Sequence, residues 1–244
     1  GNVFAMRNII QIQEQVESIL RARFQYHICS IWYSPSLSDF GEVGTGNLLW
    51  DEARLFVMTC SHVAEKALSS SNFEIALTNG AHLRKHQIEL YQSSEEDDIA
   101  LLLVKDNVDL SDLRPLTLKD FELVDDFRKI EANSVFFVCG FPSGLVVPEN
   151  KTIVLRPLFF QTVLDDERKP TEKQLYLEYP SDRDMPELPE ALGLSGAGIW
   201  KMRPLANKNI WSTDDMKCIA IQHAWVTGIF VSCSPLTRLF EWLK

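Results

Sequence analysis

The stretch Leu192–Trp200 reads LGLSGAGIW and places Ser195 between glycines directly before an apolar run. Because glycine lacks a Cβ, Gly193 and Gly196 allow turn conformations that other residues avoid, and they allow a substrate carbonyl to approach closely. A serine held in such a turn is an exposed nucleophile, and the backbone N–H groups of Gly193 and Ser195 can point together at a developing oxyanion. The same motif also occurs as an ordinary turn before a strand, so the rest of the chain must decide its meaning.

Two further stretches carry the groups that such a serine needs. The apolar run Leu55–Met58 leads into a small-residue turn and delivers His62 at the start of a short helix. Asp98 lies at the mouth of a buried strand, Ile99–Val104. A base, an orienting carboxylate and a nucleophile are the three groups of an acyl-transfer triad.

Three short motifs therefore stand in the order His, Asp, Ser: Thr59–His62 (TCSH), Asp98–Leu102 (DIALL) and Gly193–Ala197 (GLSGA). In order and spacing they resemble the motifs of trypsin-like (chymotrypsin-fold) serine proteases. The likeness covers most of the chain from about His27 onward. It also includes three further segments, Gly44–Leu49, Cys218–Gln222 and Gly228–Phe230.

The resemblance implies a role for each matching residue. His62 would be the general base, Asp98 its partner and Ser195 the nucleophile, with the N–H groups of Gly193 and Ser195 forming the oxyanion hole. Asp98 is preferred to Asp97 because it immediately precedes Ile-Ala-Leu, as the family's aspartate does. Asp97 and the glutamates before it are interpreted as a solvated charge run.

The pattern of strands fits an all-β chain of two six-stranded antiparallel barrels, with an N-terminal amphipathic helix and a C-terminal helix. We expect residues 1–25 to hold the first helix, 26–118 the first barrel, and 119–244 a linker, the second barrel and the last helix. The site would lie between the barrels. The strands are expected at Tyr26–Trp32, Val43–Trp50, Leu55–Cys60, Phe73–Thr78, His86–Tyr91, Ile99–Val104, Val135–Gly140, Thr152–Leu164, Gln174–Tyr179, Ala197–Met202, Lys217–Gln222 and Gly228–Ser232, with a short helix over Asp120–Lys129.

The two terminal helices are predicted from helical spacing of apolar residues. In residues 7–24 these are Ile9, Ile12, Val16, Ile19 and Leu20. This stripe either packs against the outside of the first barrel or docks a partner or a further domain. At the other end, Pro235 opens a second stripe that runs to Leu243.

Composition limits the partners and the compartment. Lys plus Arg total 24 against 34 for Asp plus Glu, a net charge of −10, which argues against nucleic acid. The cysteines number five, mostly in apolar runs, and are interpreted as reduced; the family's usual disulfide around the histidine loop is missing, since Cys60 has no cysteine soon after it. With no signal sequence and no apolar run long enough to span a membrane, we expect a cytoplasmic protein that needs neither membrane nor cofactor. No Cys/His spacing matches a metal site.

The resemblance also bears on activation and specificity. Leu194 stands where propeptide-activated members carry an aspartate, so no ion pair with a new N-terminus can set the oxyanion loop. The substrate pocket would be framed by Pro189, Gln222, His223, Ala224, Trp225 and Gly228. Pro189 at its floor does not imply trypsin-like preference for Arg or Lys. His223 either favours an acidic substrate side chain or is a polar residue at a strand end.

Two other functions compete with a serine endopeptidase acting on proteins or peptides. An α/β-hydrolase needs the order Ser, acid, His and a second glycine in its elbow, and Ala197 stands at that place. A protease-like binding or regulatory module with a latent site is favoured by Leu194 and the unassigned first helix, and opposed by the intact triad. The long loop Tyr179–Leu192, rich in proline and acidic residues, is where a regulatory partner or further domain is expected to act.

Overall fold

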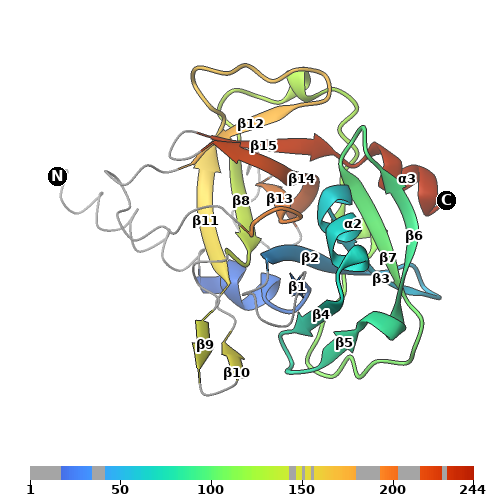
Figure 1. The fold of residues 1–244 in the computed structure, drawn as a ribbon. Coiled ribbons are helices and arrows are strands. Elements are labelled where there is room, and N and C mark those ends of the chain that lie inside the picture. The colour runs from blue at the N-terminus through green and yellow to red at the C-terminus, as the bar shows by residue number, and fades with distance from the viewer. Residues whose placement is uncertain are drawn as a thin grey trace.

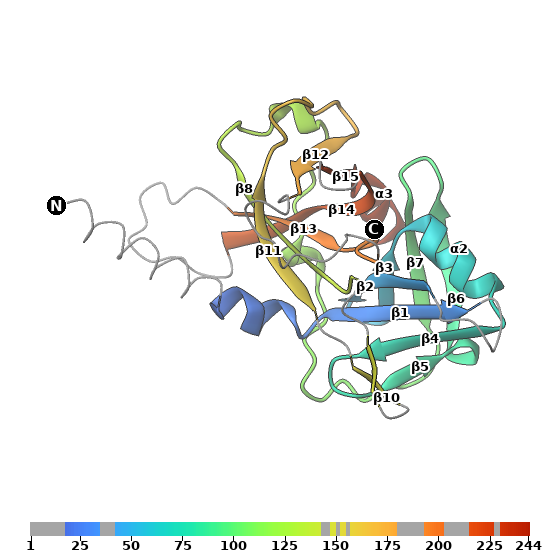
Figure 2. The same cartoon turned by 60° about the vertical axis from the view of Figure 1, so that its left-hand side comes forward.

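The computed structural model describes residues 18–34, 42–142, 147–149, 152–154, 157–179, 193–202, 215–226 and 230–244. Within them the chain forms two curled antiparallel sheets, which lie side by side in Figures 1 and 2. This confirms the predicted all-β fold of two barrel-like halves. Residues 18–24 are helical, and the rest of the expected N-terminal helix lies outside the described residues.

The first sheet has seven strands in the order β5-β4-β1-β2-β3-β7-β6, one more than predicted because the short β5 was missed. Strand β3 is buried along its whole length, whereas β4 alternates between buried and half-buried residues. The helix after β3 was predicted. The elements are β1 Ile28–Ser34, β2 Glu42–Trp50, β3 Leu55–Thr59, α2 Ser61–Ser69, β4 Asn72–Leu77, β5 His82–Arg84, the 3-10 helix η1 Lys85–Gln87, β6 Ile88–Ser94 and β7 Ile99–Val104.

The second sheet has six strands in the order β11-β8-β13-β14-β15-β12, and a separate hairpin joins β9 to β10. The segment predicted as one strand over Thr152–Leu164 is two short strands in different sheets, and β14 runs on beyond Gln222 to Val226. The elements are β8 Val135–Gly140, β9 Val147–Glu149, β10 Thr152–Val154, β11 Leu158–Val163, β12 Leu175–Glu178, β13 Gly198–Met202, β14 Met216–Val226, β15 Phe230–Pro235 and α3 Thr237–Trp242.

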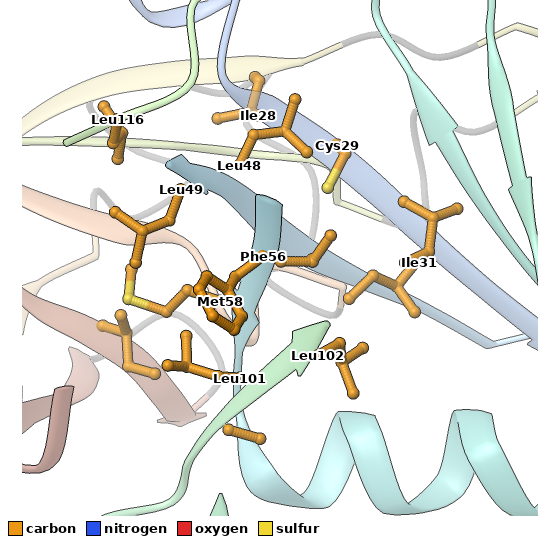
Figure 3. Close-up of a cluster of buried hydrophobic side chains, with 14 of the residues drawn as sticks. Ile28, Cys29, Ile31, Leu48, Leu49, Phe56, Met58, Leu101, Leu102 and Leu116 are labelled. Carbon is orange, nitrogen blue, oxygen red and sulfur yellow. The ribbon is translucent and has the colours of Figure 1, made fainter. Parts of the chain in front are cut away.

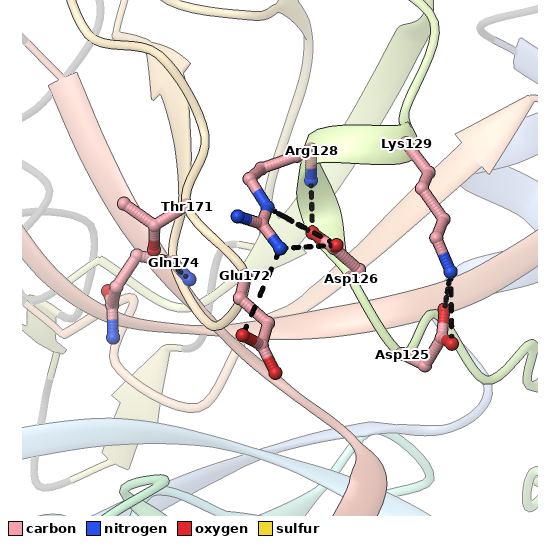
Figure 4. Close-up of polar contacts among 7 residues, drawn as sticks. All are labelled: Asp125, Asp126, Arg128, Lys129, Thr171, Glu172 and Gln174. Carbon is pink, nitrogen blue, oxygen red and sulfur yellow. Dashed lines mark hydrogen bonds and ion pairs between the residues drawn. The ribbon is translucent and has the colours of Figure 1, made fainter.

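The helix predicted over Asp120–Lys129 is wrong. Two single 3-10 turns, η2 Leu118–Asp120 and η3 Phe127–Lys129, stand there instead. The backbone of this segment bonds to other parts of the chain instead of to itself, since the Glu122 N–H donates to the Cys218 carbonyl and the Phe127 N–H donates to the Glu172 carbonyl. The carboxylate of Asp126 accepts the N–H of Arg128 and caps η3, as Figure 4 shows.

The helical segments near both ends of the described chain pack against the sheets. Figure 3 shows the cluster inside the first sheet, where aliphatic side chains of β1, β2, β3 and β7 interdigitate. Leu20 and Phe24 of the N-terminal helix are buried in the same cluster, and the ring of Phe24 lies 4.5 Å from that of Trp200 in β13. The described part of the first helix is therefore packed on the body of the protein. Helix α3 crosses back to β7 of the first sheet (Figure 1).

Candidate active site

The turn that carries Ser195 adopts the backbone conformation that its glycines allow. Gly193 and Gly196 both have φ of +95°, in the left-handed region that favours glycine. A Cβ built on Gly196 would collide with the carbonyl oxygen of Thr45 and lie 2.5 Å from the hydroxyl of Thr59. The turn is thus pressed against strands β2 and β3, and only glycine fits at position 196.

Polar groups of the first sheet hold this turn from outside. The N–H of Thr45 donates to the Ser195 carbonyl at 2.9 Å, and its hydroxyl donates to the Gly193 carbonyl at 2.9 Å. The side-chain amide of Asn47 donates to the Gly196 carbonyl at 2.8 Å. Three of the four carbonyls from Gly193 to Gly196 therefore accept hydrogen bonds from β2. Leu194 itself is fully buried, so apolar packing completes the support.

His62 and Asp98 form a two-point contact. The ring Nδ1 of His62 lies 2.7 Å from Asp98 Oδ2, and the backbone N–H of His62 donates to Oδ1 at 3.0 Å. Burial on its own raises the pKa of Asp98, but the hydrogen bonds from His62 outweigh it and hold that pKa below its usual value. Asp98 has φ of +47°, at the end of a tight turn in which its N–H donates to Glu95. The carboxylate is therefore ionised and fixes the orientation of the imidazole.

One carbonyl joins the histidine segment to the serine turn. The carbonyl oxygen of Gln222 accepts the N–H of Gly196 at 2.8 Å and the thiol of Cys60 at 3.0 Å. Cys60 is two residues before His62 and Gly196 directly follows Ser195, so this carbonyl links the segment of His62 to the turn of Ser195. Ser195 is half-buried, and within the described residues its Oγ has no hydrogen bond to His62. Such contacts are often long without substrate.

His62 and Asp98 line a cavity of about 430 Å³ that also receives His223. Nε2 of His223 lies 2.9 Å from Gln174 Oε1 and 3.0 Å from the hydroxyl of Ser232, and its Nδ1 lies 3.9 Å from Asp98 Oδ2. Asp98 thus stands between two imidazoles. The other lining residues are Ser61, Glu65, Glu95, Glu96, Gln174 and Ser234.

The donor atoms of Cys60, His62 and Asp98 lie within 4.8 Å of one another, the spacing of a metal site. Burial raises the pKa of the Cys60 thiol well above its usual value, and the Asp98 charge adds to this effect. Metals bind the thiolate, which is disfavoured here. His62 and Asp98 are already hydrogen-bonded to each other. The donor set therefore suits proton transfer better than metal binding.

A solved structure of similar fold is that of a serine endoprotease from Yersinia pestis. The two align with a TM-score of 0.54 and 15% identity over 91% of this chain and 64% of that chain. No protein-family model and no curated protein matches the sequence. At this identity the likeness concerns the fold, and the fit to a serine-endoprotease architecture agrees with the two curled sheets.

The predicted substrate-binding positions are scattered. Pro189 and Gly228 lie outside the described residues. The Gln222 side chain is fully buried, whereas His223 lines the cavity beside Asp98, and the substrate-binding role of both stays a prediction. Ala224 is exposed and Trp225 half-buried, with its ring 6.5 Å from Tyr179, so these two stay candidates.

One carboxylate was misplaced by the sequence pattern. Asp97, predicted in a solvated charge run, is only 5% exposed because α3 folds over it and Arg238 approaches to 3.4 Å. Glu95 and Glu96 are exposed as expected. Two supporting residues were missed, Gln174 and Ser232, whose only signal is a polar side chain beside or within an otherwise apolar strand.

Proposed function

We propose that the chain is a serine endopeptidase that cleaves proteins or peptides through an acyl-enzyme on Ser195. The observation that carries the proposal is the His62–Asp98 contact, tied through the Gln222 carbonyl to the turn that bears Ser195. An imidazole held on both its ring and its backbone by an ionised carboxylate is oriented to act as a general base. The fold shared with a serine endoprotease supports the same conclusion.

In the proposed reaction the Ser195 oxygen attacks the scissile carbonyl carbon, and Nε2 of His62 takes the hydroxyl proton. Asp98 stabilises the imidazolium that forms. The negative charge on the carbonyl oxygen is met by the N–H groups of Gly193 and Ser195, neither of which donates to a backbone carbonyl within the described residues. His62 returns the proton to the leaving amine as the C–N bond breaks, and water then hydrolyses the ester by the same path.

The alternative proposal is a protease-like binding module with a latent site. Leu194 is fully buried among apolar residues of the second sheet, so the turn is supported without an acidic residue at this position. This supports a turn that is set by packing and independent of a new N-terminus. We therefore propose that residues added before Gly1 leave the activity intact, and that any control comes from a partner or a further domain.

The five cysteines, all buried and free, support the predicted reducing compartment. No helix of the described residues is long and apolar enough to cross a membrane.

A fluorophosphonate probe separates the two proposals. It should label the wild type on Ser195 and leave Ser195→Ala unlabelled, and both Ser195→Ala and His62→Ala should lose peptide hydrolysis by about 10⁴-fold or more. Circular dichroism should show both variants folded, since His62 is 40% exposed in its side chain. Failure of the folded wild type to react, with or without added cell extract, would favour the binding module.

A further inference from the structure

Asp98 receives His62 on one side and faces a second histidine, His223, on the other. The two rings come from different halves of the protein, His62 from α2 beside the first sheet and His223 from β14 in the second. Both point Nδ1 at the same oxygen, Oδ2, at 2.7 and 3.9 Å respectively. A single carboxylate charge is therefore within reach of two groups that can become cations.

The partners of His223 decide where its proton sits. The amide oxygen of Gln174 only accepts hydrogen bonds, and the Ser232 hydroxyl already donates to it at 2.8 Å. Both oxygens near Nε2 are then acceptors, so Nε2 carries the proton of the neutral ring. Nδ1 is left with a bare lone pair toward Asp98, and 3.9 Å is too long for a hydrogen bond. In this state His223 is neutral and makes no ion pair with the Asp98 carboxylate.

The backbone of Gln174 is held in a hydrogen-bonded turn, which positions its side chain beside His223. Its backbone closes a turn with Thr171, in which the Gln174 N–H donates to the threonine hydroxyl at 3.0 Å and the carbonyl accepts at 2.9 Å. The same turn is fastened to η3, since the Glu172 carbonyl accepts from Phe127 and its carboxylate lies 3.9 Å from Arg128 (Figure 4). The acceptor for Nε2 is thus positioned by a structured loop.

Other charged groups also face the cavity, on α2 and on the turn before β7. From α2, His62 and Glu65 face the cavity, and from the turn before β7, Glu95 and Glu96. Glu96 is paired with Lys173 at 2.6 Å and with Arg238 at 3.5 Å. Burial lowers the pKa of His223, while Asp98 opposes this and a charged His62 adds to it. These directions agree with a neutral His223 beside an ionised Asp98 near pH 7.

We propose that His223 is a positioning residue that acts on the catalytic pair through Asp98: its neutral ring leaves the carboxylate charge to His62, and its protonated ring competes for that charge. This inference rests on the proposed function for its effect on catalysis, but the competition itself is a property of the three side chains. In the protonated state Nδ1–H of His223 donates toward Oδ2. The imidazolium of His62 is then less stabilised, and proton removal from Ser195 becomes harder.

The competition can be measured without any catalysis, by following the five histidine ring signals against pH by NMR. Single His→Gln variants assign the signals. In His62→Gln the pKa of His223 should rise by about one pH unit, because the competing cation is gone, and in Asp98→Asn it should fall. If the pKa of His223 is the same in both variants as in the wild type, the inference is overturned, whether or not the chain hydrolyses peptides.

A kinetic experiment tests the same inference by changing the charge of the side chain at position 223. His223→Lys places a permanent cation beside Asp98, and its kcat should be at least about 10-fold below that of the neutral His223→Gln, with the same KM. Glu95→Lys also adds positive charge to the cavity, at an exposed side chain, and should cost much less. Equal kcat in the Lys and Gln variants at position 223 would overturn the inference. Absence of hydrolysis in every protein, with the NMR competition present, would instead overturn the proposed function.

Discussion

The turn around Ser195 and the ring cluster of His27, Phe24 and Trp200 differ in how their buried polar groups are paired. At the turn, the carbonyls of Gly193, Ser195 and Gly196 all accept hydrogen bonds from β2. In the ring cluster, neither ring nitrogen of His27 has a hydrogen-bond partner among the described residues, and the indole N–H of Trp200 also has none. The hydrogen bonds of the first region fix the conformation of the turn, whereas each unpaired group of the second region lowers the stability by about 1–3 kcal/mol.

This difference predicts that changes near the turn act on activity, whereas changes at His27 act on stability. The largest effect is expected for Asp98→Asn. An amide cannot hold the His62 tautomer or stabilise its cation, so kcat/KM should fall by about 10⁴-fold, equivalent to about 5.5 kcal/mol. Peptide hydrolysis is the measurement, and the melting temperature should change little.

Asp97→Asn is the matched control, one residue away. Its carboxylate points to Arg238 at 3.4 Å and lies in a different contact from the catalytic pair. A loss of activity larger than that of Asp98→Asn would show that the orienting carboxylate has been assigned to the wrong residue.

The second effect in size is expected for Gly196→Ala, which joins activity and stability. A non-glycine residue at φ of +95° is strained, and its Cβ meets the backbone of Thr45, so the free energy of unfolding should fall by about 3 kcal/mol or more. Gly80→Ala separates strain from collision, because Gly80 has φ of +87° but nothing within 4 Å of an added Cβ. It should cost about 1 kcal/mol in urea unfolding. Equal losses at the two glycines would mean that the turn is not pressed against β2.

A smaller effect is expected when pH is lowered, and it concerns His27. Burial lowers the pKa of His27 to about 3 from an ordinary 6.5, and nearby Arg23 adds to the shift. Below pH 6.5 the unfolded chain binds a proton that the folded chain rejects, so stability falls as pH drops from 6.5 toward 3. At pH 5 this term amounts to about 2 kcal/mol.

His27→Phe removes this titration while keeping a ring against Phe24 and Trp200. Its unfolding free energy should change about 2 kcal/mol less than that of the wild type between pH 7 and pH 5. His86→Gln, at an exposed position, is the control and should follow the wild type. A His27→Phe protein with the full wild-type pH dependence would place the acid sensitivity elsewhere.

Local patterns in the sequence were enough for most of the strands, and the resemblance to a known family pointed to the pair His62 and Asp98, which the structure brings into contact. Each of these two residues lies close to the end of a buried strand, His62 after β3 and Asp98 directly before β7, so an apolar run a few residues away marks its place. The contacts of Thr45 with Gly193 and of Gln174 with His223 span 148 and 49 residues of chain. No local period reports on such pairs. The helix expected over Asp120–Lys129 failed for a related reason, since the backbone of this segment bonds to Cys218 and Glu172, which lie far away in the sequence.

The position of Thr45 has a consequence for how the protein is assembled. Its hydroxyl accepts from Phe141 while donating to Gly193, and its carbonyl accepts from Thr59, so one buried residue of β2 gathers segments from β3, from the end of β8 and from the serine turn. The second half of the chain therefore lacks some of the groups that hold the turn around Ser195, since the hydrogen bonds from β2 come from the first half. Expressed without the first sheet, it would have Ser195 but not the strand that fixes the conformation of its turn, so we expect the proposed active site to form only when the two halves fold together.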